Sequence, residues 1–410
     1  MFQQGMLRAF KHRNYRVFFI GQFFSLIGTW ISSIACGWLV FRLTHSEFLL
    51  GVVSFAGQFP SVLVAPFAGV LVDRWDRQKV LICTQCASML QSLSLAILTL
   101  TGVIGFWSIC ALSLVQALIN AFDMPARQIF VGELMEDKAD LPNAIALNSA
   151  MFNGARLLGP AIGGFLIAFS NEGICFLIDA ISYLAVLISL FSIVPMRTIT
   201  TRARENILLE LKAGVKYVYE HQPIKELLFL VGLIGFFATS HLVLMPVFAH
   251  EIFQAGPKLL GLLMAASGLG ALSGALILAK KYGVAGFGSL ITRSSIFLGI
   301  SLIGFSYVTL LAPSLFFIFA SGASMVLLLA SCNTLIQTLV KDEMKGRVMS
   351  IYFMSFMGMM PLGNLAAGMI ANHFGASHTV FISGVCCLLV TIHFVRKLPE
   401  IRRRVLPIEI

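Results

Sequence analysis

Long runs of apolar residues, separated by short polar intervals, make up most of the chain. Each run is long enough to cross a bilayer as a helix, because about 20 apolar residues span the hydrocarbon core. The runs cover residues 14–42, 48–72, 80–101, 104–122, 143–168 and 174–194, and then 226–249, 259–279, 288–310, 314–338, 348–371 and 377–395. Six runs, a polar break and six more predict an all-α membrane protein with twelve transmembrane helices in two pseudo-symmetric six-helix bundles.

The composition supports this class and leaves little room for an extramembrane domain. Hydrophobic residues make up 58% of the 410 positions, whereas roughly 45–50% is usual in a soluble domain. We therefore expect an N-terminal bundle at residues 1–195, a cytoplasmic linker at 196–224 and a C-terminal bundle at 225–410. The N-terminal residues do not have the pattern of a cleaved signal peptide, so the first span is expected to act as the targeting signal.

The net charge of +10 reflects membrane topology rather than nucleic-acid binding. A nucleic-acid surface gathers basic and aromatic residues on one folded face, whereas here short basic clusters lie between apolar runs. Basic loops favour the cytoplasmic side, so we expect a multi-pass protein of the bacterial inner membrane with both termini cytoplasmic. The cytoplasmic clusters contain Arg8, Lys11, Arg13, Arg74, Arg77, Lys79, Arg127, Lys138, Lys280, Lys281, Lys341, Lys345, Arg347, Arg396, Lys397 and Arg402–Arg404. The opposite loops contain only Arg42 and Lys258.

The central linker contains apolar residues at helical spacing. Leu208, Leu211, Val215 and Val218 recur at intervals of three or four positions. Two interpretations fit this pattern. The segment is either an amphipathic helix on the inner membrane surface or a solvated helix that links the two halves.

Cysteine spacing and nucleotide motifs give no sign of a cofactor. The eight cysteines lie in apolar runs. Cys83 and Cys86 have the spacing of a metal or redox pair, but inside a span we interpret them as small packing residues. No metal, disulfide or cofactor is expected. The sequence has no Gly-x-x-x-x-Gly-Lys-Ser/Thr loop, so an ion gradient is the expected energy source.

The stretch AGVLVDRWDRQKVL, residues 68–81, concentrates charge between two apolar runs. Topology explains its basic residues but not Asp73 and Asp76, because acidic residues contribute little to orientation. Gly69 lies one helical turn before Asp73, where a small residue lets another helix approach closely. An aspartate at this position can accept hydrogen bonds from a helix N-terminus or an arginine. The pattern therefore predicts a local structural role for the acids.

This loop resembles the signature Gly-x-x-x-Asp-Arg-x-Gly-Arg-Lys/Arg of the major facilitator superfamily. The matching residues are Gly69, Asp73, Arg74 and Arg77. Asp76 stands where the family has its second glycine, and Gln78 stands where it has a further basic residue. The resemblance implies the major facilitator fold and a cytoplasmic latch between the halves, in which the Asp faces the start of span eleven and the Arg meets an acid at the end of span four. Asp123 is placed for that acidic role.

A glycine-rich stretch in span five extends the resemblance. The stretch contains Gly159, Pro160, Gly163 and Gly164, and it is similar to the antiporter motif of the same superfamily, although the upstream glycine is at position 154 rather than 155. The resemblance implies an exporter, and close helix packing explains the same glycines. Residues 10–44, 121–160 and 333–353 narrow the resemblance to the bacterial branch that contains the enterobactin exporter and related drug or macrolide efflux proteins.

Arg156 is the most unusual residue within a predicted span, because a lone charge there costs roughly 2.5–3.5 kcal/mol. Ser149, Asn153, Arg156 and Pro160 are spaced four, three and four apart, so they share one helix face. Arg156 either faces a cavity and contacts an anionic cargo, or is a buried arginine paired with Asp179 or with backbone carbonyls.

Other polar residues within the spans are candidates for binding or coupling. Asp179 either carries a proton or balances Arg156, and the coupling acid is open between Asp179, Asp123 and neither. His241 either packs through hydrogen bonds or takes part in coupling, and Pro246 should kink its span. Further candidates are Gln22, Gln58, Gln116, Asn120, Asn333 and Gln337. The methionines at 349, 354, 357, 359 and 360 are interpreted as lipid-facing packing rather than as a tolerant apolar site.

We expect a secondary active transporter rather than an enzyme or a channel. The spans contain isolated polar residues instead of paired catalytic groups, and no repeated filter motif is present. The leading hypothesis is export of a small amphiphilic metabolite, a siderophore, by proton-coupled alternating access, with the bilayer and the proton gradient as partners and a monomer as the expected oligomeric state. The alternatives are a multidrug or macrolide efflux pump and, after these, a lysophospholipid flippase.

Overall fold

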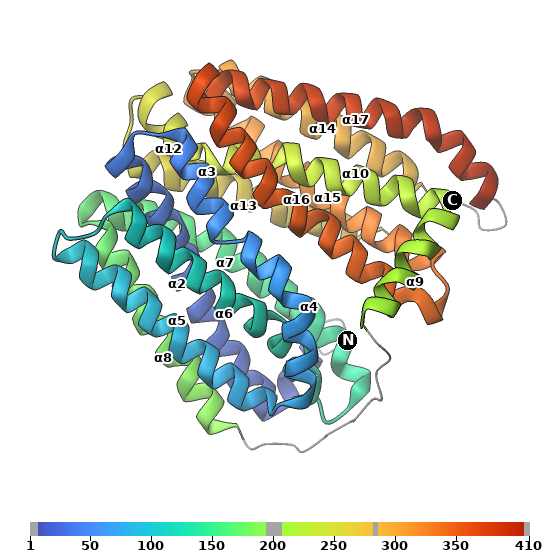
Figure 1. Ribbon diagram of the computed structural model, residues 1–410, viewed down its shortest axis with the longest axis horizontal. Coiled ribbons are helices and arrows are strands. Elements are labelled where there is room, and N and C mark those ends of the chain that lie inside the picture. The colour runs from blue at the N-terminus through green and yellow to red at the C-terminus, as the bar shows by residue number, and fades with distance from the viewer. Residues whose placement is uncertain (1–6, 194–206, 282–285, 406–410) are drawn as a thin grey trace. The chain divides into compact units, whose positions relative to one another are not determined.

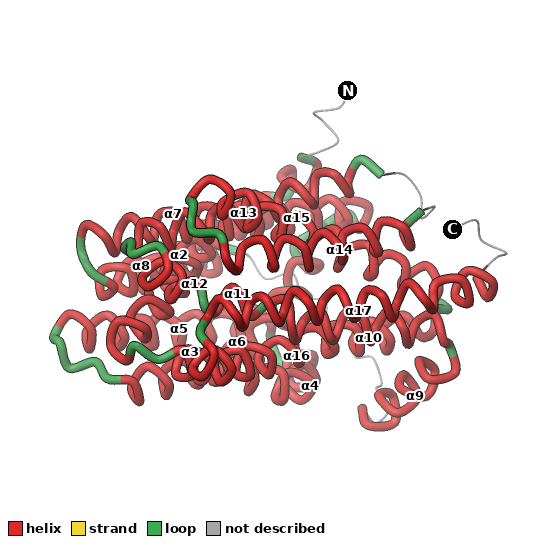
Figure 2. The backbone as a smooth tube through the Cα atoms, turned by 90° about the horizontal axis from the view of Figure 1, so that it is seen from above, coloured by secondary structure: helices red, strands yellow, loops and turns green. Residues whose placement is uncertain are grey.

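The computed structural model describes residues 7–193, 207–281 and 286–405. The side chains of Lys138 and of residues 207–211 and 399–405 are not described. Helices joined by short loops make up almost all of this part of the chain (Figures 1 and 2). Twelve of its helical segments are long and apolar enough to span a membrane, which confirms the expected all-α fold with twelve spans.

The chain divides into two compact units. The first comprises Met1–His45, Val53–Thr201 and Ala255–Ala265, and the second comprises Ser46–Val52, Arg202–Gln254 and Ala266–Ile410. The helices of the first half of the chain are α2 (Arg13–Thr44), α3 (Glu47–Ala56), α4 (Phe59–Arg74), α5 (Arg77–Leu100), α6 (Phe106–Glu133), α7 (Leu141–Phe169) and α8 (Glu172–Ser192). Those of the second half are α9 (Ile207–Glu220), α10 (Gln222–Ala238), α11 (Ser240–Val243), α12 (Met245–Val247), α13 (Pro257–Ala279), α14 (Phe287–Tyr307), α15 (Leu311–Leu339), α16 (Lys345–Phe374) and α17 (Ala376–Val405).

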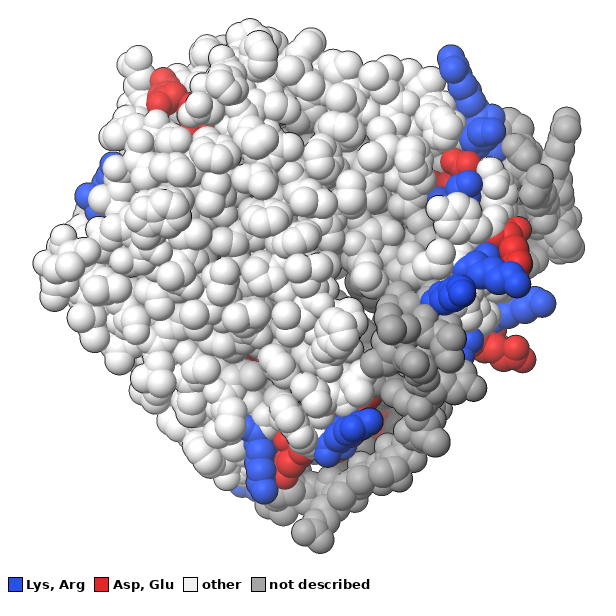
Figure 3. Space-filling model, in the orientation of Figure 1, with Lys and Arg blue, Asp and Glu red and all other residues white. Residues whose placement is uncertain are grey.

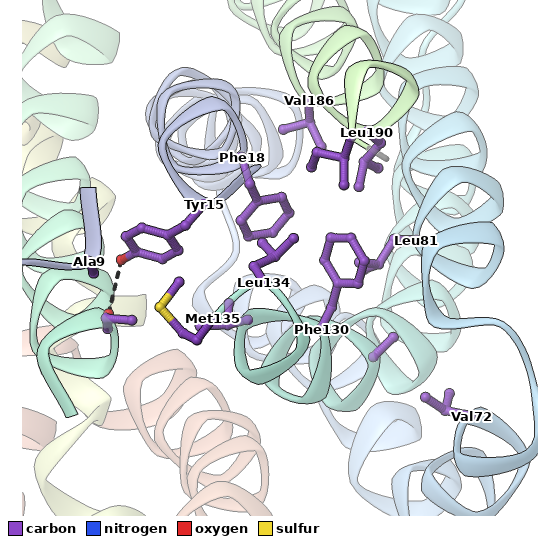
Figure 4. Packing of buried hydrophobic residues seen from close by; sticks show 14 residues of the cluster. Ala9, Tyr15, Phe18, Val72, Leu81, Phe130, Leu134, Met135, Val186 and Leu190 are labelled. Carbon is purple, nitrogen blue, oxygen red and sulfur yellow. Dashed lines mark hydrogen bonds between the residues drawn. The ribbon is translucent and has the colours of Figure 1, made fainter. Parts of the chain in front are cut away.

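In the first unit, α2 packs against α7 and α8, and α5 packs against α6 and α8. A buried apolar cluster, which includes Phe18, Phe130 and Leu190, lies between these helices (Figure 4). The Tyr15 hydroxyl at the edge of the cluster donates to the Ala144 carbonyl oxygen at 3.0 Å (Figure 4). This bond ties the start of α2 to α7, and the packing fixes which helix faces can carry polar groups into the unit.

In the second unit, α14 packs between α15 and α17, and α10 packs against α16 and α17. The linker helix α9 packs against α16. Val218 of the expected apolar stripe is buried, but Val215 is exposed, and Gly214 and Tyr217 complete the packed face. Val215 therefore lies outside the face of α9 that packs on α16, and the choice between a membrane-surface helix and a solvated linker stays a prediction. Leu208 and Leu211 have side chains outside the described part, as do Arg402–Arg404.

Two spans are interrupted near prolines. Span two breaks at Gly57 and Gln58, just before Pro60 opens α4. Span seven breaks at Thr239 and Leu244, ahead of Pro246, and continues through α11, α12 and a π-helical turn at Phe248–Ile252. Proline has no N–H for the helical ladder, so the expected kink at Pro246 takes the form of a segmented helix.

Span four extends further than expected. The apolar run ends near residue 122, but α6 continues through Pro125 to Glu133. The continuation carries Asp123 and Arg127, which pair with one another across one helical turn, so their charges do not end the helix. As a result Asp123 lies inside the span and Glu133 lies at its end.

Candidate functional site

A buried polar stripe on α5 gives the first unit a polar interior. Residues on this stripe follow a helical spacing of three and four, and they are Thr84, Gln85, Ser88, Gln91 and Ser92. Buried polar groups are costly unless they are hydrogen-bonded. The stripe finds its partners on α6 and α8, and two of these partners are acidic.

Asp179 on α8 is a buried carboxyl group surrounded by hydroxyls. Asp179 is only 3% exposed. Its Oδ2 accepts a hydrogen bond from Ser92 Oγ at 2.6 Å. The hydroxyls of Thr29 and Ser32 on α2 lie beside it, and a Cβ on Gly28 would come within 3.0 Å of Oδ1. Within the described part of the chain, Oδ1 has no hydrogen-bond partner, and the side chains beside the carboxyl group are the hydroxyls of Ser92, Ser32 and Thr29.

Asp123 on α6 is equally buried but has a different set of neighbours. Its Oδ1 accepts from Thr84 Oγ1 at 2.9 Å and from Gln85 Nε2 at 2.7 Å. Its Oδ2 accepts from the Arg127 guanidinium, which also supplies a compensating charge. Both carboxylate oxygens are therefore occupied by donors on α5 and α6.

Arg156 on α7 is half-buried and lies over an aromatic ring. Its guanidinium carbon is 5.9 Å from the centre of the Trp30 ring on α2. Across residues 7–193, 207–281 and 286–405 it has no carboxylate within salt-bridge distance, so the alternative pairing with Asp179 was wrong. On the same helix, Asn153 Nδ2 donates to the Ser149 carbonyl oxygen at 2.8 Å. Asp179 is bonded to Ser92 instead.

The glutamine candidates of the first half are spread over three spans. Gln22 is buried on α2. Gln58 Nε2 donates to Ser54 Oγ at 3.0 Å, next to the break in span two. Gln116 Nε2 on α6 donates to Ser88 Oγ at 3.2 Å, so this residue alone of the three has a described bond to the α5 stripe.

In the second unit the polar candidates have local partners. His241 Nδ1 donates to the Ala238 carbonyl oxygen at 2.6 Å, inside the interrupted span. Asn333 Oδ1 accepts from Gln337 Nε2 at 2.6 Å on the same helix. The neighbouring Thr239 Oγ1 donates to Asn364 Oδ1 on α16 at 3.1 Å. The structure does not bring His241 and Asn333 into a shared described contact.

The charged loop between α4 and α5 is held by its own unit. Asp76 caps α5 by accepting from the backbone N–H groups of Gln78 and Lys79 at 3.1 and 3.3 Å. Gln78 Nε2 donates to the carbonyl oxygens of Leu190 and Ile193 at 2.7 and 3.3 Å, which satisfies the end of α8. Both departures from the family signature therefore have structural roles.

The arginine of the motif has an acidic partner other than the one expected. Arg77 donates through Nη2 to the Asp73 carbonyl oxygen at 3.0 Å, and its Nη1 lies 3.4 Å from Glu133 Oε1. The expected pairing with Asp123 was wrong, because α6 extends to Glu133 and Arg127 occupies Asp123. A Cβ on Gly69 would meet no described atom within 4 Å, and Arg74 is exposed.

The glycines of span five let α7 pack closely on α2. A Cβ on Gly159 would collide with Trp30 Cβ and lie 3.1 Å from the Ile27 carbonyl oxygen. A Cβ on Gly163 would lie 2.5 Å from Ile34 Cγ2. A Cβ on Gly164 would lie 2.6 Å from Gly261 Cα, which belongs to the same unit. Pro160 is buried. These contacts give the glycines a packing role.

Sequence reasoning missed the partners of Arg156, Asp179 and Arg77. Trp30, Ser92 and Glu133 are typical residues for their positions, so nothing in their identity marks them. The polar residues of α5 did carry a signal, since Gln85, Ser88 and Ser92 recur at helical spacing within an apolar run. That spacing predicts a buried polar face on span three.

Comparison with known proteins places this arrangement among transporters. A family model described as "Transmembrane secretion effector" matches residues 4–406. The staphyloferrin A transporter of Staphylococcus aureus is 28% identical over 387 residues, covering 92% of this chain and 95% of that protein. Macrolide efflux protein A of Streptococcus pyogenes is 25% identical, with 93% and 96% covered. An enterobactin exporter of Escherichia coli is 26% identical, with 95% of each chain covered.

Solved structures show the same fold at lower sequence identity. The nucleoside transporter NupG has a TM-score of 0.72 at 12% identity, covering 94% of this chain and 99% of that one. A bacterial homologue of the iron transporter ferroportin, in an inward-facing state, has a TM-score of 0.70 at 15% identity, covering 94% and 98%.

Proposed function

Because the chain belongs to the transmembrane secretion effector family of major facilitator transporters, we propose that it is a secondary active exporter of a siderophore. The cargo leaves the cytoplasm of a bacterium across the inner membrane by alternating access, in exchange for inward proton flow. Both termini lie in the cytoplasm, as the basic loops indicate.

The similarity to the staphyloferrin A transporter carries the proposal. It extends over 92% of this chain, so it includes both halves of the transporter and not only a shared motif. The enterobactin exporter supports the same cargo class over a similar length. Two relatives named for siderophores, each matched over 95% of its length, favour a siderophore over an unrelated metabolite.

Arg156 is the residue that we assign to an anionic group of the cargo. Its guanidinium lies over Trp30 and has no carboxylate partner in the described part of the chain. An arginine can bind a carboxylate through two parallel hydrogen bonds while its plane stacks on an aromatic ring. The half-buried position leaves it accessible to a ligand, with Asn153 one turn away as a neutral hydrogen-bonding group.

Asp179 is the residue that we assign to the coupling proton. A buried carboxyl group with only hydroxyl neighbours can be held neutral or charged with a small rearrangement of those hydroxyls. Asp123 differs, because its carboxylate compensates the charge of Arg127 and accepts two further hydrogen bonds from α5. The geometry therefore favours Asp179 for proton exchange and Asp123 for structure.

A macrolide or multidrug efflux pump is the second candidate. Macrolide efflux protein A covers 93% of this chain at an identity only a few points lower. The two functions differ in the cargo and not in the fold or the energy source.

A deletion strain distinguishes the two functions. Siderophore in the culture medium and susceptibility to macrolides are measured together in wild type, deletion and complemented strains under iron limitation. We expect secreted siderophore to fall at least about tenfold on deletion and to return on complementation. Unchanged secretion together with macrolide hypersensitivity would reject siderophore export in favour of the second candidate.

The assignment of Arg156 predicts a loss of cargo binding. Arg156→Ala should raise the KM for an anionic cargo by at least about tenfold, because a charge-assisted contact is worth roughly 1.5–3 kcal/mol. Lys258→Ala is the matched control, since Lys258 Nζ also lies over an aromatic ring of the first unit, 4.1 Å from the centre of Phe169. Unchanged transport by Arg156→Ala at normal protein levels would remove Arg156 from the binding site.

A further inference from the structure

One face of the linker helix α9 is fixed against α16. A Cβ on Gly214 would lie 3.2 Å from both Arg347 Cβ and Ile351 Cδ1. The Tyr217 hydroxyl accepts a hydrogen bond from the Lys341 backbone N–H at 3.4 Å. These contacts hold α9 against the first turns of α16 and the residue Lys341 ahead of it, and they determine which face of α9 points away from the unit.

The opposite face of α9 combines basic, apolar and aromatic side chains. Lys212, Val215, Lys216 and Tyr219 are spaced three, one and three apart, so they form one stripe, and all four are exposed. Val215 is 41% and Tyr219 is 67% exposed. Lys225, near the start of α10, extends this stripe because its Nζ lies 5.0 Å from the centre of the Tyr219 ring.

The stripe carries an excess of positive charge. Its three lysines are opposed by Glu220, which lies 3.9 Å from Lys216 and is the one acid among the described side chains of α9. Figure 3 shows basic side chains gathered where α9 lies, whereas the adjoining broad surface of this unit is almost free of charge. The stripe is therefore more charged than a lipid-facing span. It also exposes Val215 and Tyr219, which are apolar or aromatic side chains that an ordinary solvated helix does not gather on one face.

The stripe also lies close, along the chain, to the start of a membrane-spanning segment. α9 ends at Glu220 and span seven begins at Gln222, so one residue separates the helix from the membrane-spanning segment. At 1.5 Å per residue, Lys216 and Tyr219 lie within roughly 10 Å along the chain of that boundary, and the headgroup region of each leaflet is of that order of thickness.

We propose that this stripe of α9 binds the headgroups of anionic phospholipids. The Lys212, Lys216 and Lys225 ammonium groups contact lipid phosphates, while Val215 and the Tyr219 ring enter the boundary between headgroups and acyl chains. Lysines with long apolar stems and interfacial tyrosines are suited to this depth. Each lysine near an anionic surface contributes about fivefold in affinity, the equivalent of about 1 kcal/mol. The bound helix anchors the linker to the membrane beside α16.

A tryptophan placed in the stripe tests the proposal directly. The full-length Tyr219→Trp protein is reconstituted in bilayers containing either brominated phosphatidylglycerol or brominated phosphatidylcholine, and the fluorescence of the four native tryptophans is subtracted with the parent protein. We expect half-maximal quenching at an at least fivefold lower mole fraction of phosphatidylglycerol. Adding Lys212→Gln, Lys216→Gln and Lys225→Gln should abolish that preference, whereas Lys11→Gln, Lys79→Gln and Lys280→Gln, with the same change in charge, should preserve it.

Two results overturn the proposal. Equal quenching by both lipids would show contact with acyl chains but no recognition of the anionic headgroup. Quenching by aqueous acrylamide, with none by either brominated lipid, would show a solvated helix. The readout is lipid contact, so it is independent of which cargo the protein transports.

Discussion

Asp179 and Asp123 show how neighbours, rather than burial, separate the roles of two residues. Each is 3% exposed. Asp123 has an arginine and two neutral donors, whereas Asp179 has a serine donor and nearby hydroxyls. A fully bonded ion pair is suited to a structural role, and a carboxyl group without a counter-ion is suited to exchange a proton.

Replacing Asp179 should uncouple export without unfolding the protein. Asp179→Asn retains the shape and an acceptor for Ser92 but cannot lose or gain a proton. We expect export to become independent of an imposed pH gradient and the apparent melting temperature to change by no more than a few degrees. Transport driven by acid pulses in vesicles measures the first quantity, and full pH-driven export by Asp179→Asn would contradict the assignment.

Replacing Asp123 should have the opposite effect. Asp123→Asn leaves Arg127 without its partner, and we expect a loss of about 1–3 kcal/mol in the free energy of unfolding. Thermal unfolding in detergent, followed by fluorescence, measures this loss. If Asp123→Asn were as stable as the wild type but defective in proton coupling, Asp123 would be the coupling acid and the proposed assignment of the two acids would be wrong.

At this scale the sequence indicates which residues are unusual but not what they contact. Arg156 and Asp179 stand out because charges are rare within spans. Their partners Trp30 and Ser92 do not stand out, since the two pairings depend on how four helices are rotated about their axes. No local pattern encodes that rotation.

The extension of α6 changes the interpretation of the charged loop. Arg77 meets Glu133 because the helix continues past Pro125. A double-mutant cycle with Arg77→Ala and Glu133→Gln should give a coupling energy of about 0.5–2 kcal/mol, since both side chains are largely shielded from water. Arg77→Ala with Asp123→Asn should give additive effects. Coupling between Arg77 and Asp123 instead of Glu133 would support the contact expected from the sequence.

The packing of α7 on α2 predicts that two glycines of α7 respond differently to replacement by alanine. Gly159→Ala should destabilise the protein by about 1–3 kcal/mol, because the new methyl group meets Trp30 and the Ile27 backbone. Gly154→Ala is the matched control on the same helix, since its Cβ would meet nothing closer than Phe23 at 4.0 Å, and it should be neutral or slightly stabilising. Equal effects of the two changes on the melting temperature would show that these contacts do not limit helix approach.

Elements are predicted from the sequence more reliably than their ends and interruptions. The twelve apolar runs correspond to the twelve spans because each must satisfy its own backbone hydrogen bonds in lipid. The end of α6 was misplaced, because an ion pair within one turn lets a helix continue through polar residues. The breaks in spans two and seven depend on local packing around Gly57 and Thr239 as well as on the prolines.

For the whole molecule, the distribution of basic residues predicts its orientation in the bilayer. A fluorescent protein that matures only in the cytoplasm, fused after Ile410, should fluoresce, and alkaline phosphatase at the same position should be inactive. The reverse pattern would place both termini outside and would exchange the two membrane faces. It would also move α9 and the charged loop to the outer surface.

The fold and the transporter family follow from patterns that extend over the entire chain, whereas the cargo depends on a few side chains. Relatives named for siderophores and for macrolides match over nearly the same length. General contacts such as Arg156 over Trp30 favour an anionic ligand class and do not encode a single compound. The cargo must therefore be measured.

Transport in inside-out membrane vesicles tests the central claim most directly. Iron-free siderophore, purified from the medium of the source bacterium, is added to vesicles that contain the wild-type protein, the Asp179→Asn variant or no transporter. The proposal predicts that only wild-type vesicles accumulate the siderophore, by at least about tenfold over empty vesicles, and that a protonophore abolishes the accumulation. Accumulation equal to that of empty vesicles, or wild-type accumulation unaffected by the protonophore, would contradict proton-coupled siderophore export.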